Sequence, residues 1–226
     1  MREFSQSLGA DLFGVASAEG YSREFPDKPS PFSFVRDAKS IIMIGMAFLK
    51  GTMDTVLRPQ LSNLKGTAEE QVSGGVRPQG AERYFFGEEN KLLLQETEWI
   101  GYRIARRLEQ DGYSAFYFPA YKQDPRHRTA LFYMTPGLHM AGMGTLGLNC
   151  CVITPEYGPR VFINAIITNL ELPTGMPLKK EICTHCGDCV KACPSGALDG
   201  VGWKNIYRCA AYGCCGTCLA ICPVGR

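Results

Sequence analysis

The sequence lacks a long apolar run, a large net charge, and a basic segment followed by an apolar one at its start. Its longest apolar stretch, Ile41 to Leu49, falls short of the roughly 20 residues that a membrane helix needs, so we expect no membrane span. The net charge of +2 gives no case for a nucleic-acid partner. The start of the chain predicts neither a secretory signal nor a twin-arginine leader, and we therefore expect a cytoplasmic protein.

Cysteine is absent from residues 1–149 and abundant afterwards: nine of the eleven cysteines lie after residue 182, and the other two are Cys150 and Cys151. Disulfide scaffolds are typical of small secreted proteins, whereas this uneven distribution and the odd total favour a metal-binding segment in a reducing compartment. Zinc sites also use Cys-x2-Cys pairs, but repeated runs that end in Cys-Pro are not the zinc pattern. Cys150 and Cys151 themselves are expected to be small buried residues.

Two cysteine runs, each closed by a Cys-Pro pair, occupy residues 183–194 and 209–223. The first has the spacing C-x2-C-x2-C-x3-C-P of bacterial ferredoxins, in which three thiolates hold one [4Fe–4S] cluster and the fourth reaches a second cluster. We therefore expect two [4Fe–4S] clusters, which we name cluster A and cluster B.

The ferredoxin rule divides the cysteines between the two clusters. The expected ligands of cluster A are Cys183, Cys186, Cys189 and Cys222. Those of cluster B are Cys193, Cys209, Cys215 and Cys218. Cys214 is the alternative to Cys209, but it adjoins Cys215, and neighbouring residues rarely ligate the same cluster comfortably. His185, which lies between two ligands, is expected to be a surface residue.

Helical and strand patterns alternate over the first 175 residues, which predicts an α/β core. The expected helices cover residues 2–8 and 89–111, and the expected strands cover residues 12–16, 41–48, 115–118 and 161–168. In the longer helix, the apolar residues predicted to be core are Leu92, Leu93, Trp99, Ile100, Ile104 and Leu108. We expect two domains, 1–175 and 176–226, joined by a linker around residues 172–177.

The stretch from Gly51 to Gly80 has scattered Gly, Pro, Thr, Ser and Gln and only weak periodicity. This composition predicts a long loop, and such loops are either functional or plain insertions. An active-site lid and an insertion or interface arm both remain open.

Gly142, Gly144 and Gly147 form a G-x-G-x-x-G motif. A dinucleotide-binding motif must follow a strand and open a helix, but residues 135–140 resemble a turn or a helix, so we do not expect a nicotinamide or flavin site. The glycines instead predict that the backbone lies very close to something, either another chain segment or a flat cofactor.

The residues around this motif carry a family resemblance. His139 to Asn149 reads HMAGMGTLGLN, and Ile153 to Val161 reads ITPEYGPRV. This order of segments, followed by the two cysteine runs, resembles the epoxyqueuosine reductase and reductive dehalogenase superfamily over roughly residues 80–223. The resemblance implies a nitroreductase-like α+β core that holds a corrinoid (cobalamin), with the ferredoxin-like module passing electrons to cobalt.

The resemblance also implies roles for individual residues. The residues expected to bind the cofactor are His139, Gly142, Gly144, Gly147, Asn149 and Arg160. Two of these have simpler alternatives, because His139 can be a structural histidine and Arg160 can brace a turn. Proton donors for a two-electron reduction would lie nearby, and the candidates are Tyr121, Asp124, His127 and Tyr84.

Two functional hypotheses follow from the resemblance. The first is a cobalamin-dependent reductase that acts on a small-molecule substrate and takes electrons from a ferredoxin- or flavodoxin-type donor. The alternative is a two-cluster electron-transfer protein that serves a partner, such as a corrinoid protein. Residues 116–120 lack the acid that epoxyqueuosine reductases carry, and the chain stops at Arg226 without their C-terminal extension, so we expect no action on tRNA. A corrinoid-sized cavity beside the three glycines would favour the first hypothesis, and a filled one the second.

Overall fold

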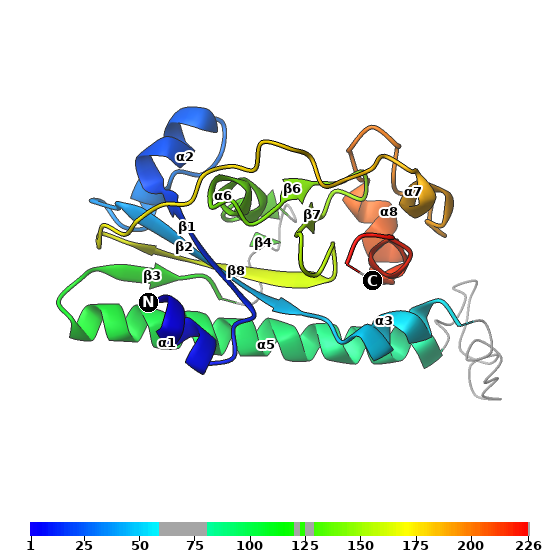
Figure 1. Ribbon diagram of the computed structural model, residues 1–226, viewed down its shortest axis with the longest axis horizontal. Coiled ribbons are helices and arrows are strands. Elements are labelled where there is room, and N and C mark those ends of the chain that lie inside the picture. The colour runs from blue at the N-terminus through cyan, green and yellow to red at the C-terminus, as the bar shows by residue number, and fades with distance from the viewer. Residues whose placement is uncertain (59–80, 120–122, 125–128, 226) are drawn as a thin grey trace.

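The computed structural model describes residues 1–58, 81–119, 123–124 and 129–225. The described residues form a central sheet between layers of helices, with the cysteine-rich segment at one end of the sheet (Figure 1). In chain order the elements are α1 (Arg2–Ser7), β1 (Leu12–Ser17), α2 (Ala18–Glu24), η1 (Pro31–Ser33), β2 (Ser40–Ala47), α3 (Lys50–Val56), α5 (Ala81–Gln110), β3 (Ala115–Tyr117), β4 (Gln123–Asp124), β5 (Thr129–Ala130), α6 (Met134–Met140), β6 (Thr145–Leu146), β7 (Val152–Ile153), β8 (Val161–Thr168), α7 (Asp188–Lys191), α8 (Ile206–Ala211) and α9 (Thr217–Ala220). No helix among these residues is both long enough and apolar enough to cross a membrane.

The main sheet has four strands in the order β1-β2-β8-β3, and every neighbouring pair is antiparallel. The predicted strands therefore exist, and the fold mixes helix and sheet as expected, but it is not the parallel α/β type that alternating helices and strands often give. β2 is a central strand whose residues 40–45 are all buried. An almost wholly apolar strand suits this position because helices cover both of its faces.

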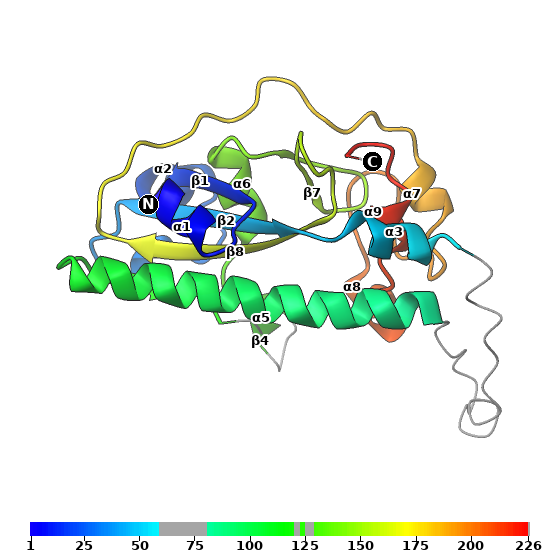
Figure 2. The ribbon, with the colours of Figure 1, turned by 60° about the horizontal axis from the view of Figure 1, so that its bottom comes forward.

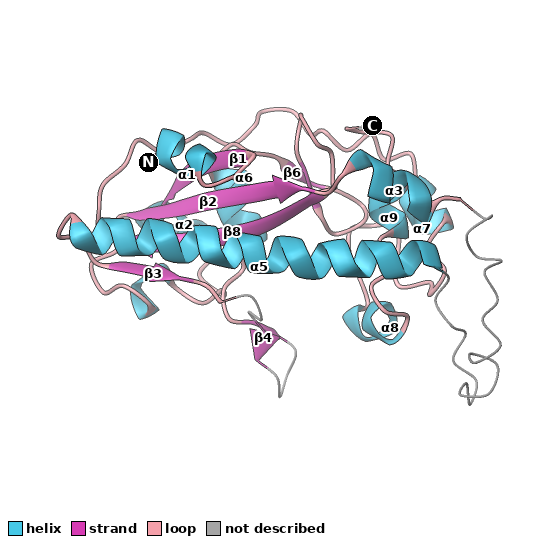
Figure 3. Ribbon diagram, turned by 90° about the horizontal axis from the view of Figure 1, so that it is seen from below, coloured by secondary structure: helices cyan, strands magenta, loops and turns pink. Residues whose placement is uncertain are grey.

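Alternate side chains of β2 face the two helical layers. Ile42 and Ile44 pack with Ile104 and Leu108 of α5, which crosses one face of the sheet (Figure 3). Ile41 and Met43 belong to a second cluster that includes residues of α2 and α6 on the opposite face. Because neighbouring side chains in a strand point to opposite faces, one short apolar run supplies both halves of the core.

α5 begins at Ala81, earlier than the helix predicted from residue 89, and ends at Gln110 as the Asp111-Gly112 stop predicts. The predicted core positions Leu93, Ile100, Ile104 and Leu108 are buried. Leu92 and Trp99 are 54% and 58% exposed, so this part of the prediction is wrong. A helix on one face of a sheet buries a single stripe, and neither residue lies on the stripe that faces β2 and β8.

The first part of the predicted long loop is helical, because α3 covers Lys50–Val56. Residues 59–80 lie outside the described residues. α3 and the first half of α5 lie beside the cysteine-rich segment (Figure 2). There, Phe48, Met53, Phe86 and Leu93 form one apolar cluster with Ala220 of α9.

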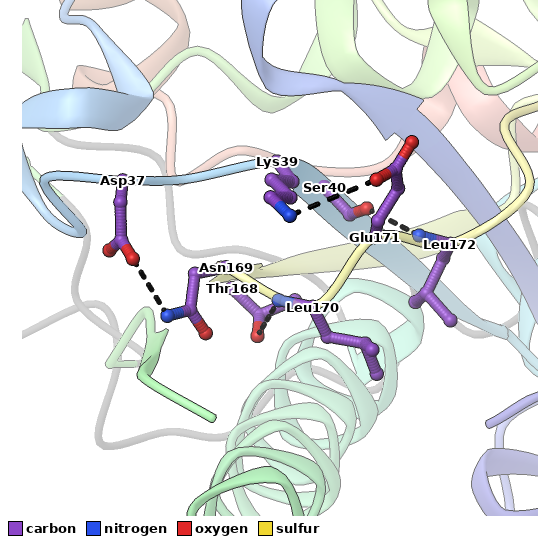
Figure 4. Close-up of polar contacts among 8 residues, drawn as sticks. All are labelled: Asp37, Lys39, Ser40, Thr168, Asn169, Leu170, Glu171 and Leu172. Atoms are coloured by element: carbon purple, nitrogen blue, oxygen red, sulfur yellow. Dashed lines mark hydrogen bonds and ion pairs between the residues drawn. The ribbon is translucent and has the colours of Figure 1, made fainter. Parts of the chain in front are cut away.

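The chain leaves β8 at the far end of the sheet and runs across to the cysteine-rich segment as an extended linker (Figure 1). Polar contacts hold its start against the end of β2: Leu172 donates its backbone N–H to Ser40 Oγ at 3.0 Å, and Lys39 lies 3.8 Å from Glu171 (Figure 4). Asn169 donates to Asp37 at 2.9 Å, which lowers the pKa of that carboxyl group. Further along, Gly175 donates to the carbonyl of Val15 at 2.8 Å, so the linker follows β1.

Candidate iron–sulfur centres

The first cysteine pocket brings together the ligands expected for cluster A. Its walls include the side chains of Cys183, Cys186, Cys189 and Cys222. Burial raises the pKa of Cys189, and the charges of the other three thiols add to this effect. The rest of the wall is largely apolar and comes from the β6–β7 region and from the residues after Cys222. Four thiols around one pocket are the donor set that a [4Fe–4S] cluster requires.

A glycine turn and a hydrogen bond to β6 position the cysteines of the first run around the pocket. Gly187 has φ +78° and precedes α7, which carries Cys189 in its first turn. Thr145 of β6 accepts a 3.0 Å hydrogen bond from the backbone of Ile182, which fixes the chain just before Cys183. His185 is exposed, and its Nε2 lies within hydrogen-bond distance of Glu181 Oε2, at 2.9 Å, so the histidine is a surface residue as expected.

The second pocket is lined by the remaining cysteines of the two runs, which are Cys193, Cys209, Cys214, Cys215 and Cys218. Helices α8 and α9 carry Cys209 and Cys218. Gly216, with φ +72°, starts α9 and lies against the Phe86 ring, where a Cβ would come within 2.7 Å. Four of these five cysteines are the set expected for cluster B, and four thiols also fit a [4Fe–4S] cluster; Cys214 is the fifth.

Each pocket draws one ligand from the other cysteine run. Cys193 closes the first run but lines the second pocket, whereas Cys222 closes the second run but lines the first pocket. Among the described residues, no three His, Cys, Asp or Glu side chains converge on a point where a single metal ion could bind. The arrangement therefore has the crossed connectivity of two-cluster ferredoxins.

Cys209 and Cys214 occupy the same corner of the second pocket. A hydrogen bond between their thiols raises the pKa of Cys209 and lowers the pKa of Cys214 to about 6. Cys214 has a left-handed backbone, with φ +51°, and it is exposed. Both residues are placed to provide the eighth thiolate, so the choice between them stays a prediction.

Cys193 receives hydrogen bonds at its sulfur. Its Sγ accepts a 3.3 Å hydrogen bond from the backbone N–H of Ala197 and lies 3.5 Å from Ser195 Oγ. Although burial raises the pKa of Cys193, these hydrogen bonds lower it overall. Hydrogen bonds of this kind stabilise a thiolate and tune the potential of any cluster that it ligates.

The glycine motif is packed against the chain itself. A Cβ on Gly142, which has φ +72°, would collide with the Met176 carbonyl in the linker. A Cβ on Gly144 would come within 2.5 Å of the Ile153 carbonyl oxygen, and one on Gly147 would collide with the Ile153 side chain. Of the two readings of these glycines, close approach to another chain segment is the one that the geometry supports.

The three polar residues expected at a corrinoid also contact the chain. His139 Nδ1 lies 3.4 Å from the carbonyl oxygen of Gly144. Asn149 is 1% exposed and donates to the Cys218 carbonyl at 3.3 Å. Arg160 donates to the carbonyls of Phe48 at 2.7 Å and Gly225 at 3.1 Å, so it braces the turn.

The described residues therefore leave no room for a corrinoid on the side of each glycine where a Cβ would lie. Protein atoms fill the space beside all three glycines, and each polar candidate has a partner within the chain. Tyr121 and His127 lie outside the described residues. Tyr84 lies in α5 and Asp124 in β4, but their side chains are not among those described, so the proton-donor candidates stay predictions.

Two residues near cluster B were not assigned a role from the sequence. Cys151 is half-buried and lines the second pocket, and burial raises its pKa. Lys204 lines the same pocket, although nothing in its local sequence distinguishes it from the other lysines. Cys150, the neighbour of Cys151, points its thiol to the Gly202 carbonyl at 3.0 Å. The structural signal for Cys151 and Lys204 is their place in the wall of the second pocket.

Comparison with known proteins gives a family match, a curated relative and two solved structures of similar fold. Residues 179–198 match the family model described as a 4Fe-4S binding domain. Epoxyqueuosine reductase of Listeria monocytogenes serovar 1/2a is 35% identical over 106 residues, which is 38% of this chain and 28% of that protein. The chain thus spans less than a third of that relative.

Two solved structures share the fold. One is an epoxyqueuosine reductase with an epoxyqueuosine-modified tRNA stem loop; it has a TM-score of 0.62 and 20% identity over 99% of this chain and 64% of that one. The other is a reductive dehalogenase whose structure is described as suggesting a mechanism for B12-dependent dehalogenation. It has a TM-score of 0.63 and 19% identity over 99% of this chain and 31% of that one.

Proposed function

Because the chain belongs to the epoxyqueuosine reductase / reductive dehalogenase superfamily, we propose that it is an iron–sulfur oxidoreductase with two [4Fe–4S] clusters. The observation that carries this proposal is the division of the cysteines of the two runs into two pockets, each with at least four thiols and with crossed connectivity. When bound, each cluster would exchange one electron at a time at low potential.

The protein's own residues hold the two sites in a fixed relation. Asn149 lines the first pocket and donates to the backbone of Cys218 in the second, so one buried amide links the two sites. Phe86 of α5 closes the second pocket on the core side. The largely apolar walls of both pockets shield part of each site from water, which helps to keep the potentials low, although Cys186 is exposed.

The geometry of the glycine motif favours an electron acceptor that is not held in that segment. We therefore propose that the chain takes electrons from a ferredoxin- or flavodoxin-type donor and passes them to an acceptor on a partner protein. The superfamily suggests a corrinoid as the acceptor's cofactor. A reducing cytoplasm remains the proposed location, since the clusters need free thiols.

A cobalamin-dependent reductase with its own small-molecule substrate is the second candidate. It is favoured by the fold shared with the B12-dependent dehalogenase. Under that proposal the candidate groups are His139, Gly142, Gly144, Gly147, Asn149 and Arg160, with Tyr84, Tyr121 and Asp124 as proton donors. Protein atoms would have to move away from the glycines before a corrinoid could bind there.

The deciding experiment is anaerobic purification from cells supplied with cobalamin, followed by iron, sulfide and cobalt analysis. We expect about eight irons per chain and no cobalt, even after reconstitution with cobalamin. About eight irons with one cobalt per chain would support the second candidate instead. One zinc and no sulfide per chain would refute both proposals.

A nucleic-acid partner also needs a test, although the sequence led us to expect none. The matched epoxyqueuosine reductase structure contains a tRNA stem loop. Electrophoretic mobility shift with a tRNA stem loop, compared with an unrelated RNA hairpin of equal length, would measure such binding. Selective retardation of the tRNA stem loop would replace the protein acceptor in our proposal with a nucleic-acid substrate.

A further inference from the structure

The second cysteine pocket has a cation in its wall and the first does not; Lys50 and Arg160 line a separate pocket on another side of Cys222. Lys204 is the only lysine or arginine among the described residues that line the two cysteine pockets, and it belongs to the second pocket. Lys204 shares that wall with Cys209, Cys215 and Cys218, all expected ligands of cluster B. The two sites therefore differ in electrostatic surroundings although their donor sets are alike.

A short hairpin holds Lys204 toward the pocket. Lys204 forms a bridge with Leu198, and the hairpin is closed by a 2.8 Å hydrogen bond from the Asn205 backbone to the Ala197 carbonyl. At its tip, Asp199 Oδ1 accepts hydrogen bonds from the backbone of residues 201 and 203 at 2.8 and 3.0 Å. The side chains at 201 and 203 are 86% and 60% exposed, so the hairpin turns them outward and Lys204 inward.

The core side also holds this hairpin. Cys150 donates its thiol hydrogen to the Gly202 carbonyl at 3.0 Å, which ties the tip of the hairpin to the segment before β7. Within the described part of the chain, no carboxylate pairs with Lys204. A partly buried ammonium group without a carboxylate needs another negative partner.

A thiolate-ligated cluster is such a partner. Four thiolates on a [4Fe–4S] core give a net charge of about −2, which becomes about −3 when the cluster gains one electron. A nearby ammonium group attracts the reduced form more strongly than the oxidised form. Its charge therefore raises the reduction potential.

We propose that Lys204 holds the reduction potential of cluster B above that of cluster A, so that cluster B is the first of the two to be reduced. This inference rests on the proposed two-cluster function. In the step that it describes, an external low-potential donor loses one electron and cluster B gains it, with no bond made or broken and no proton transferred. Lys204 acts on cluster B through its positive charge and does not ligate iron.

The test is a redox titration of the anaerobically purified protein, followed by electron paramagnetic resonance of both clusters. Lys204→Gln removes the charge, Lys204→Arg keeps it, and Lys180→Gln removes an exposed charge that lines neither pocket. A Cys215→Ser variant assigns the spectra, because only the cluster B signal should change or vanish. Iron content of each variant is measured first.

In Lys204→Gln we expect the cluster B midpoint to move to a more negative potential, with cluster A unchanged. A tenfold fall in the ratio of reduced to oxidised cluster at fixed potential corresponds to about 59 mV for one electron. Lys204→Arg and Lys180→Gln should keep the wild-type midpoints.

Three outcomes would overturn the inference. These are unchanged midpoints in an iron-replete Lys204→Gln protein, an equal shift of both clusters, or the same shift in Lys204→Arg. If Lys204→Gln loses iron, Lys204→Met, which keeps the apolar stem of the side chain, is titrated in its place. Iron loss in both variants, with iron retained in Lys180→Gln, would be a fourth contrary outcome, because it would show that the role of Lys204 is structural. Failure of the proposed function can be told apart from failure of this inference. If the wild-type protein does not hold two clusters, the proposed function has failed before any variant is made.

Discussion

Replacing Gly142 with alanine tests whether the protein itself fills the space beside the glycine motif. Gly142 has φ +72°, and a Cβ would collide with the Met176 carbonyl oxygen. A left-handed backbone costs alanine about 1–2 kcal/mol, and forcing packed backbone apart adds roughly 1–3 kcal/mol. We therefore expect Gly142→Ala to lower the free energy of unfolding by about 2–5 kcal/mol.

Gly112 provides the matched control. It also has a positive φ, +89°, but no atom lies within 4 Å of the position that a Cβ would take. Gly112→Ala should therefore show backbone strain alone, about 1–2 kcal/mol. The assay is anaerobic thermal unfolding, in which 1 kcal/mol shifts Tm by roughly 2–4 °C for a chain of this size.

The comparison separates the two readings of the glycine motif. If the linker fills the space, Gly142→Ala melts several degrees below Gly112→Ala. Equal losses of stability would contradict the packing argument and would leave room for a flat cofactor beside Gly142.

Three further predictions concern the cluster sites and the core. Cys209→Ala should lose about four irons per chain while Cys214→Ala keeps all of them, measured by iron analysis; the reverse result would make Cys214 the ligand. Ile104→Ala should cost about 2–5 kcal/mol in denaturant unfolding because Ile104 is fully buried, whereas Leu92→Ala on the same helix should cost under about 1 kcal/mol; equal losses would contradict the assigned helix face. Arg160→Met should make the residues after Cys222 more susceptible to limited proteolysis, since two carbonyl hydrogen bonds are lost, and an unchanged digestion pattern would show that Arg160 does not hold them.

The sheet and its main helix could be predicted because their signals are local. β2 is an unbroken apolar run, and α5 repeats apolar residues at helical spacing, so each reveals itself without knowledge of its partner. Strand direction is not local. The antiparallel pairing depends on which strands meet, and this follows from the long connections between them.

The exposed residues of α5 show a second limit of sequence patterns. Leu92 and Trp99 fit a helical apolar pattern, but the width of the buried stripe depends on how much of the sheet lies beneath the helix. Leu93 and Ile100, next to them in sequence, point inward. The sequence shows the helical spacing of the apolar residues, whereas the packing of α5 on the sheet determines which of them are buried.

The grouping of the cysteines into two pockets was predictable because cluster chemistry constrains the spacing of ligands strictly. The eight expected thiols fall into the two expected sets, and only the corner shared by Cys209 and Cys214 remains open. Lys204 could not be found in this way, because its role depends on a hairpin that turns it toward sulfur atoms distant in sequence. Sequence spacing reports ligands well but reports little about the charges around them.

The contact between Phe86 and Gly216 bears on whether the cysteine-rich segment can fold as an independent domain. Gly216 lies directly on the Phe86 ring, and Ala220 completes an apolar cluster with residues of α3 and α5. Excised from the rest of the chain, residues 176–226 would expose this face to solvent and would lose one wall of the second pocket. A cluster segment grafted onto another protein would therefore need the first half of α5 as well. A substitution at Phe86 or at Gly216 should be accompanied by a compensating substitution at the other residue.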